Sequence, residues 1–153
     1  MNIKTMTEPE TISQRIVPEF LYHVTPRKNL DKILAEGLFP DTKNSGICAL
    51  RGKEQKQHWA KKYGMQPIFL TTDPKVVICT QAGEWWIREY DAVLLKVDTA
   101  NLFLEDEFDY LKEKWNKQYT SYEAAIKAHP LGVHYICRHP ISKEDIEVSL
   151  NSI

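Results

Sequence analysis

The stretch that decides the fold class is residues 20–38, Phe-Leu-Tyr-His-Val-Thr-Pro-Arg-Lys-Asn-Leu-Asp-Lys-Ile-Leu-Ala-Glu-Gly-Leu. Residues 20–25 are rich in aromatic and β-branched side chains, which is typical of a β-strand. The rest repeats apolar residues at helical spacing (Leu30, Ile33 and Leu34), and Gly37 then supplies a C-terminal stop. We therefore expect a strand that passes directly into a short helix.

Pro26 lies at the boundary between this strand and this helix. Proline suits the first turn of a helix, because its missing N–H would have no helical partner there. A threonine before it can cap the helix with its side-chain oxygen. We therefore predict that the helix begins at Pro26 with Thr25 as its N-cap.

Further strand and helix patterns follow along the chain, without the regular alternation of a doubly wound sheet. This predicts an α+β fold in a single domain, residues 20–153, preceded by an N-terminal arm, residues 1–19. We expect helices at 52–63, 73–80, 108–116 and 120–128. We expect strands at 67–72, 91–97, 133–138 and at the end of 141–150, with a short additional strand at 102–104.

The chain has 153 residues and a net charge of −1 at pH 7. A protein that coats nucleic acid through bulk charge is usually strongly basic, so that class is excluded, whereas a substrate held by a local basic patch is not. No apolar run approaches the roughly 20 residues of a membrane span, and the N-terminus lacks the apolar core of a signal peptide. We expect a cytoplasmic protein that does not associate with membranes.

The three cysteines, Cys48, Cys79 and Cys137, are widely spaced and form no CxxC pair. A structural zinc site usually brings its ligands closer together in sequence. Disulfides are rare in a reducing compartment. We therefore expect reduced, mostly buried thiols and no metal.

The polar pair at the end of the first strand, His23 and Thr25, is the main candidate site in a sequence that lacks Walker A, GxGxxG, HExxH and GxSxG motifs. Strand alternation puts both side chains on one face. A lone histidine in an apolar strand is usually a satisfied core residue, and Thr25 has the alternative role of a helix cap.

The order of these motifs resembles the ADP-ribosyltransferase superfamily. Residues 21–38 are similar to its opening strand, which ends in His-x-Ser/Thr, and to the helix that follows. The helix part is most similar to DarT-type toxins that modify DNA bases, and less so to RNA 2′-phosphotransferases. Residues 68–73 and 133–137, the latter followed by Pro140 and Ile141, resemble the second and third signature strands.

This resemblance implies a split β-sandwich, two small sheets with flanking helices, that binds NAD as a substrate in the cleft between the sheets. His23 would bond the ribose of the adenosine half, and Thr25 would help to hold it. Residues 69–73 would line the nicotinamide side, through Phe69, Thr71 and Thr72, while Asp73 has the competing role of a helix N-cap.

The sequence departs from the family pattern at two positions. No tyrosine lies in the expected helix after Asp73, where the family's stacking tyrosine often sits. His134 stands where the catalytic glutamate would align on the third signature strand. An imidazole cannot offer the same anionic stabilisation, but it can serve as a general base near neutral pH.

Two arginines are candidates for contact with phosphates, because the planar guanidinium bonds phosphate bidentately. Arg27 directly follows the His-x-Thr strand and is expected to bind the cofactor. Arg51 follows the loop, and in DarT-type relatives an arginine from this region contributes to catalysis, so Arg51 is the second candidate catalytic residue beside His134. Either arginine could instead be a solvated surface residue.

The expected helix at 52–63 interleaves basic and aromatic side chains. Such a pattern can follow a phosphate backbone and stack on bases. The same pattern fits a helix with one wet face and an aromatic stripe on its core side. The residues in question are Lys53, Lys56, His58, Trp59, Lys61, Lys62 and Tyr63.

The resemblance as a whole implies a toxin- or effector-type enzyme that transfers ADP-ribose from NAD to a macromolecular acceptor, which could be DNA, RNA or protein. A toxin of this kind can have an antitoxin or another neutralising partner. One alternative is RNA 2′-phosphotransfer, for which Arg27, Arg51 and Arg138 would contact the phosphate. The other is a catalytically degenerate member of the fold that binds a nucleotide or a protein partner.

Overall fold

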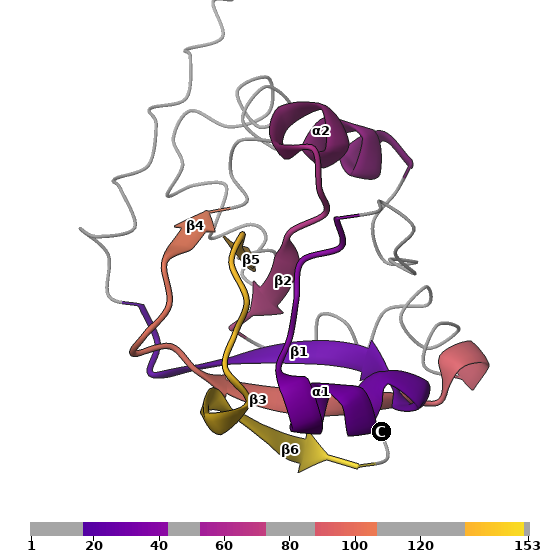
Figure 1. The fold of residues 1–153 in the computed structure, drawn as a ribbon, viewed down its shortest axis with the longest axis vertical. Coiled ribbons are helices and arrows are strands. Elements are labelled where there is room, and N and C mark those ends of the chain that lie inside the picture. The colour runs from indigo at the N-terminus through magenta and orange to yellow at the C-terminus, as the bar shows by residue number, and fades with distance from the viewer. Residues whose placement is uncertain (1–16, 43–52, 73–87, 107–133, 152–153) are drawn as a thin grey trace, which may run out of the picture.

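The computed structural model describes residues 17–42, 53–72, 88–106 and 134–151. They form an α+β fold around a six-stranded antiparallel sheet, in the strand order β4-β5-β2-β1-β3-β6 (Figure 1). The strands are β1 (Phe20–Pro26), β2 (Ile68–Thr71), β3 (Ala92–Asp98), β4 (Leu104–Asp106), β5 (His134–Cys137) and β6 (Ile146–Leu150). The helices are α1 (Leu30–Glu36), α2 (Lys53–Tyr63) and the 3-10 turns η2 (Arg27–Asn29) and η4 (Lys143–Asp145).

The sheet is divided at the junction between β1 and β2. These two strands pair at one register position, Tyr22 opposite Thr71. By contrast, β1 pairs with β3 along its whole length, and β2 likewise pairs with β5. The sheet order is continuous where the resemblance implies two sheets, but in the described residues its two three-stranded halves pair at this one register position. In Figure 1, β2 lies above β1 at a steep angle to it, and its C-terminal end is nearest to β1.

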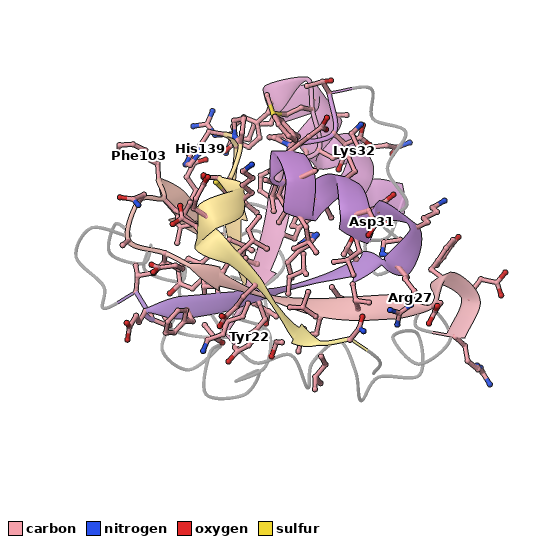
Figure 2. All side chains as sticks on the ribbon, turned by 60° about the horizontal axis from the view of Figure 1, so that its bottom comes forward. Tyr22, Arg27, Asp31, Lys32, Phe103 and His139 are labelled. Carbon is pink, nitrogen blue, oxygen red and sulfur yellow. The ribbon has the colours of Figure 1, made fainter. Side chains whose placement is uncertain are left out.

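The boundary between β1 and the first helix differs from the prediction. β1 continues through Pro26, which pairs with Ala92 of β3, and the η2 turn begins at Arg27 (Figure 2). Pro26 has φ −58° and ψ 140°, which are extended angles, and no side chain caps η2 or α1. The prediction that Thr25 is the N-cap was wrong, because pairing with β3 keeps both residues in the strand.

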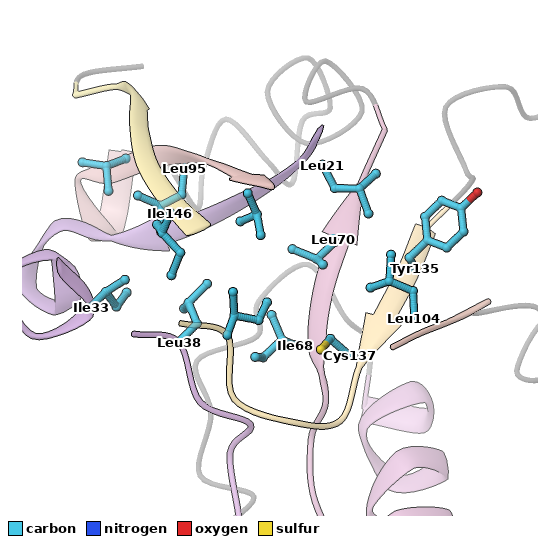
Figure 3. Packing of buried hydrophobic residues seen from close by; sticks show 13 residues of the cluster. Leu21, Ile33, Leu38, Ile68, Leu70, Leu95, Leu104, Tyr135, Cys137 and Ile146 are labelled. Atoms are coloured by element: carbon cyan, nitrogen blue, oxygen red, sulfur yellow. The ribbon is translucent and has the colours of Figure 1, made fainter. Parts of the chain in front are cut away.

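The hydrophobic core lies between the two halves of the sheet and under α1 (Figure 3). Each half contributes alternate side chains from its strands, as expected for a sheet with one face on a core. The residues are Leu21, Val93, Leu95, Val97 and Ile146 from one half, and Ile68, Leu70, Leu104, Tyr135 and Cys137 from the other, with Ile33, Leu38 and Ile141. This shared core holds together halves whose strands scarcely pair.

Gly37 ends α1, as predicted. Its N–H donates to the carbonyl of Ile33 over 2.7 Å, and its φ of 95° lies in the region that favours glycine. The next residue, Leu38, forms an antiparallel bridge with Ile141. A Cβ on Gly37 would overlap the carbonyl oxygen of Ile141. Glycine is therefore needed for the turn and for this close crossing of two chain segments.

Several other predicted elements are confirmed. The helix predicted at 52–63 is α2, and it ends before Gly64, which has φ 70°. The short strand predicted at 102–104 is present as β4, shifted to Leu104–Asp106. Cys137 is a buried free thiol, as expected. The helices predicted at 73–80, 108–116 and 120–128, the arm up to residue 16, Cys48 and Cys79 lie outside the described residues. Within the part of the chain that the structure describes, no helix has the length and apolarity of a membrane span.

Candidate functional site

His23 lies at the junction between β1 and β2. Its half-buried imidazole reaches across the junction, so that Nδ1 lies 2.8 Å from the carbonyl oxygen of Phe69, 46 residues away in sequence. A carbonyl oxygen only accepts hydrogen bonds, so Nδ1 must carry the proton and donate. In the neutral ring Nε2 is then an acceptor. The hydrogen bond therefore fixes both the orientation and the tautomer of His23.

Thr25 shares the core-facing side of β1 with His23, as alternation predicted. The register places His23 opposite Leu95 and Thr25 opposite Val93, and both partners belong to the core. Thr25 is buried, whereas His23 is half-buried. Thr25 is therefore less accessible than His23 on this face of β1.

The second signature segment forms β2 and the residue after it. Thr71 is buried and lies in register between Tyr22 of β1 and His134, the first residue of β5. Phe69 is half-buried, and Thr72 follows directly after the strand. The backbone therefore brings the three signature segments, which are far apart in sequence, onto neighbouring strands at the junction. Tyr22 was not singled out from the sequence, since only strand register reveals its position.

Arg27 has partners within the protein. Its Nε donates to the carboxylate of Asp91 over 2.7 Å, one terminal nitrogen donates to the side-chain oxygen of Asn151 over 2.7 Å, and the other donates to the Asn151 carbonyl. Asp91 has a φ of 47°, unusual for a residue other than glycine. These bonds tie the end of β1 to the start of β3 and to the residue after β6. A phosphate at Arg27 would have to compete with them.

Arg51, the predicted catalytic arginine, lies outside the described residues, as do Asp73 and the segment after it. For His134 the structure establishes the backbone position opposite Thr71.

The aromatic side chains of α2 face the sheet. Trp59 is fully buried, stacks on Tyr63 with ring centroids 5.5 Å apart, and lies 6.5 Å from the ring of Phe69. Among the described residues, its indole N–H has no hydrogen-bond partner. For Trp59, the alternative of an aromatic stripe on the core side is therefore confirmed.

Cations gather around the outer ring of this aromatic group, Tyr63. The guanidinium of Arg138 lies 4.4 Å from the centroid of that ring and the ammonium of Lys62 lies 5.2 Å from it, both within cation–π range. Arg138 also binds Glu105 through both carboxylate oxygens, one at 2.9 Å, and this hydrogen bonding raises the pKa of Arg138. Lys61 and Lys62 are exposed. A basic and aromatic surface, defined by Lys61, Lys62, Tyr63 and Arg138, thus lies over β2 and β5.

The environment of His58, on the same helix, disfavours the charged form of its ring. Burial lowers the pKa of His58, and the positive charge of Lys62 lowers it further. Its ring meets that of Trp59 edge to face, with centroids 4.7 Å apart. His58 therefore belongs with the packed aromatic side chains and not with the exposed cations.

No protein-family model matches the sequence, and the comparison with curated proteins also finds no match. Within the described ranges, no group of three or more His, Cys, Asp or Glu side chains is arranged to hold a metal ion. The residues at the β1/β2 junction are therefore the basis for assigning a function.

Proposed function

We propose that this protein is an NAD-dependent ADP-ribosyltransferase that binds NAD at the β1/β2 junction. The observation that carries the proposal is the convergence of the three signature segments on the adjacent strands β1, β2 and β5. At that point His23 is bonded to the main chain of Phe69, and Thr71 lies between Tyr22 and His134. The single register pair between β1 and β2 at the same place, within a continuous six-stranded sheet, is compatible with the split-sandwich fold that the resemblance implies.

The residues at the junction suit a nucleotide substrate. In the proposed complex the His23 ring, oriented by the hydrogen bond from Nδ1 to the Phe69 carbonyl, would contact a hydroxyl group such as that of a ribose. In the proposed complex Thr25 supports this contact, and the segment from Phe69 through Thr72 lines the nicotinamide side. Arg51 would steady the phosphates or the transition state. Arg27 could take part only by exchanging its bonds to Asp91 and Asn151.

In the proposed reaction, the bond between the nicotinamide nitrogen and C1′ of the ribose breaks, and nicotinamide leaves with the bonding electron pair. A nucleophilic atom of the acceptor forms the new bond to C1′ and loses its proton. His134, which takes the place of the family's glutamate, would accept that proton as general base. The acceptor would be a macromolecule (DNA, RNA or protein), and in a toxin of this type a neutralising partner would block the site. The proposed setting is the cytoplasm.

The basic and aromatic surface over β2 and β5 would contact the acceptor. Lys61 and Lys62 contribute exposed positive charge, and Arg138, which is paired with Glu105, follows the end of β5 opposite to His134. Because the indole of Trp59 is fully buried, a base could stack only on more exposed side chains.

The test is release of nicotinamide from NAD by the purified protein, with and without cell lysate as a source of acceptor. We expect release that depends on lysate and is abolished by His23→Ala. His139→Gln is the matched control, because it changes a histidine on the connection after β5, away from the junction, and should leave release intact. Full activity of a folded His23→Ala variant would contradict the proposal.

A catalytically degenerate nucleotide-binding protein is the second candidate function. The observation that favours it is the histidine at the first position of β5, where the resemblance calls for a carboxylate. It predicts calorimetrically detectable binding of NAD with no release of nicotinamide under any acceptor condition, whereas turnover rejects it. RNA 2′-phosphotransfer is distinguished by loss of phosphate from 2′-phosphorylated RNA in the presence of NAD.

A further inference from the structure

His139 joins two segments of the chain through both of its ring nitrogens. Its Nε2 accepts a hydrogen bond from the main-chain N–H of Phe103 over 2.9 Å. Its Nδ1 lies 2.8 Å from the carbonyl oxygen of Pro140 and donates to it, since a carbonyl can only accept. The ring therefore links the segment that enters β4 to the connection that leaves β5. Figure 2 shows Phe103 and His139 side by side.

Phe103 is presented to solvent by this link. Its side chain is 84% exposed, the most exposed large hydrophobic side chain in the described part of the chain. The rings of Phe103 and His139 meet edge to face, with centroids 5.9 Å apart. The turn before it is braced internally, because Asp98 accepts from the N–H of Ala100 and Leu102 donates to Thr99. His139 thus fastens the Phe103 end of this turn to the connection after β5, while Thr99 bonds the other end to the carbonyls of Pro18 and Glu19.

Only the neutral ring with its proton on Nδ1 can make both bonds. A protonated imidazole is a donor at both nitrogens and has no acceptor to offer. Protonation of Nε2 would point its N–H at the N–H of Phe103, so the hydrogen bond would be replaced by a repulsive contact. The bond to Pro140 would survive, because Nδ1 donates in both states.

We propose that His139 is a pH-sensitive latch that holds the Phe103 turn against the β5–η4 connection when neutral and releases it when protonated. This inference is independent of the proposed function. Its sign follows from the hydrogen bonds, because the closed state requires the unprotonated Nε2. The latch is therefore closed while Nε2 is unprotonated and opens when that nitrogen gains a proton.

The charged and titratable groups around the latch leave this sign unchanged. Arg138 precedes His139 on the same connection, and Glu105 lies on β4, but these two form an ion pair with each other. On β5, the thiol of Cys137 donates to the carbonyl oxygen of His139, and burial raises the pKa of that thiol, so it is neutral throughout the relevant range. On the turn, the carboxylate of Asp98 is bonded to Ala100.

The consequence of opening is local. Among the described strands, β4 is a short edge strand that pairs with β5, from Leu104 to Asp106. Release of Phe103 removes the hydrogen bond next to the first pair of this ladder, so β4 would fray from its start. β3 is flanked by β1 and β6 and would keep its protection.

Amide hydrogen exchange followed by nuclear magnetic resonance tests the latch, with protection factors corrected for the intrinsic effect of pH. In the unmodified protein we expect the protection of the Phe103 amide to fall by about five- to tenfold between pH 8 and pH 5, the scale of one hydrogen bond. The amides of β3 should not change. His139→Gln keeps an acceptor near the position of Nε2 but cannot titrate, so its Phe103 protection should be the same at both pH values.

Four results would overturn the latch. One is unchanged protection of Phe103 in the unmodified protein. Another is an equal loss in His139→Gln. The third is a parallel loss at β3, which would mean general acid unfolding. His139→Ala provides a second variant, expected to show low Phe103 protection at both pH values, and high protection in it would also reject the proposal.

Discussion

The imidazole of His23 and the main-chain carbonyl of Phe69 are joined by a 2.8 Å hydrogen bond at the one place where the two halves of the sheet meet. The bond has a structural consequence, since it adds a link across a junction that has a single register pair. It also has a chemical consequence, because it leaves Nε2 as the acceptor of the neutral ring. The two roles can be separated by substitution.

His23→Asn retains a donor near the position of Nδ1 but has no counterpart of Nε2. We expect its free energy of unfolding to stay within about 1 kcal/mol of the unmodified protein, because one neutral hydrogen bond contributes on that scale. Nicotinamide release should nevertheless be lost. Chemical denaturation and the release assay measure the two effects. His23→Gln is the converse control, since it loses the bond to Phe69 while extending toward the position of Nε2. Equal activity of His23→Asn and the unmodified protein would refute the assignment of Nε2 to substrate.

Gly37→Ala should be severely destabilising. The new Cβ would overlap the Ile141 carbonyl, and the backbone, with φ 95° and ψ −176°, lies in a region that is essentially restricted to glycine. We expect a loss of about 3 kcal/mol or more, or failure to fold. Gly64→Ala is the matched control: its φ is 70°, but nothing lies within 4 Å of its added Cβ. That variant should lose only about 1–2 kcal/mol. Urea denaturation compares the two, and similar losses would show that the crossing at Ile141 is not tight.

The raised pKa of the Cys137 thiol predicts that the protein loses stability at alkaline pH. Burial is the main cause that raises its pKa above the ordinary value of 9.0; a main-chain hydrogen bond at His139 lowers it in part, and the negative charge of Glu105 raises it. A raised pKa means that the folded state holds the proton more tightly than the unfolded state. The stabilisation is therefore complete below pH 9.0 and is lost as the pH rises through the raised folded value.

Denaturation curves between pH 7 and pH 10.5 would measure this slope. Cys137→Ala should be less stable overall because a buried side chain is truncated, but its stability should fall less steeply above pH 9.0. Parallel slopes for the two proteins would contradict the prediction.

The Arg27–Asp91 contact can be divided into its charge and its backbone component. Asp91→Asn removes the charge but tolerates the positive φ of 47°, so we expect a loss of about 0.2–1 kcal/mol, the range for an exposed ion pair. Asp91→Ala should lose a further 1–2 kcal/mol or so, because alanine is strained in that conformation. Thermal unfolding of both variants in low and high salt provides the measurement. High salt should reduce the difference in melting temperature between the unmodified protein and Asp91→Asn. It should leave the difference in melting temperature between the two variants unchanged.

A fifth prediction concerns the basic and aromatic surface. Lys61→Glu with Lys62→Glu should weaken lysate-dependent nicotinamide release severalfold, with no effect on the basal NAD affinity, because both side chains are exposed and lie on α2. Lys32→Glu on α1 is the control for a general change of charge (Figure 2). An equal decrease in lysate-dependent nicotinamide release by Lys32→Glu would show that this surface does not bind the acceptor.

Part of the candidate site was predictable, because strand alternation alone places His23 and Thr25 on one face. The partner of His23 was not, because Phe69 reaches it through a main-chain carbonyl that has no sequence signature. Arg27 illustrates the same limit. The guanidinium of Arg27 and its place directly after the strand suggested a contact with phosphate, but its hydrogen bonds extend to Asn151, 124 residues away. The register position of Tyr22 and the hydrogen bonds of His139 depend on tertiary pairing that no motif encodes.

The sequence by itself determined the elements whose signals are local. These are the β-rich segment at β1, the helical spacing of α1 and α2, and the glycines that end both helices, because side-chain period and backbone freedom act over a few residues. Tertiary structure decided the strand boundary and the contacts at positions where local preferences conflict or give no signal. Pairing with β3 kept Thr25 and Pro26 in the strand against their capping preference, and a core shared by both halves brought His23 to Phe69. The reason is physical: burial and strand pairing between distant segments outweigh the few tenths to about 1 kcal/mol that a helix cap contributes.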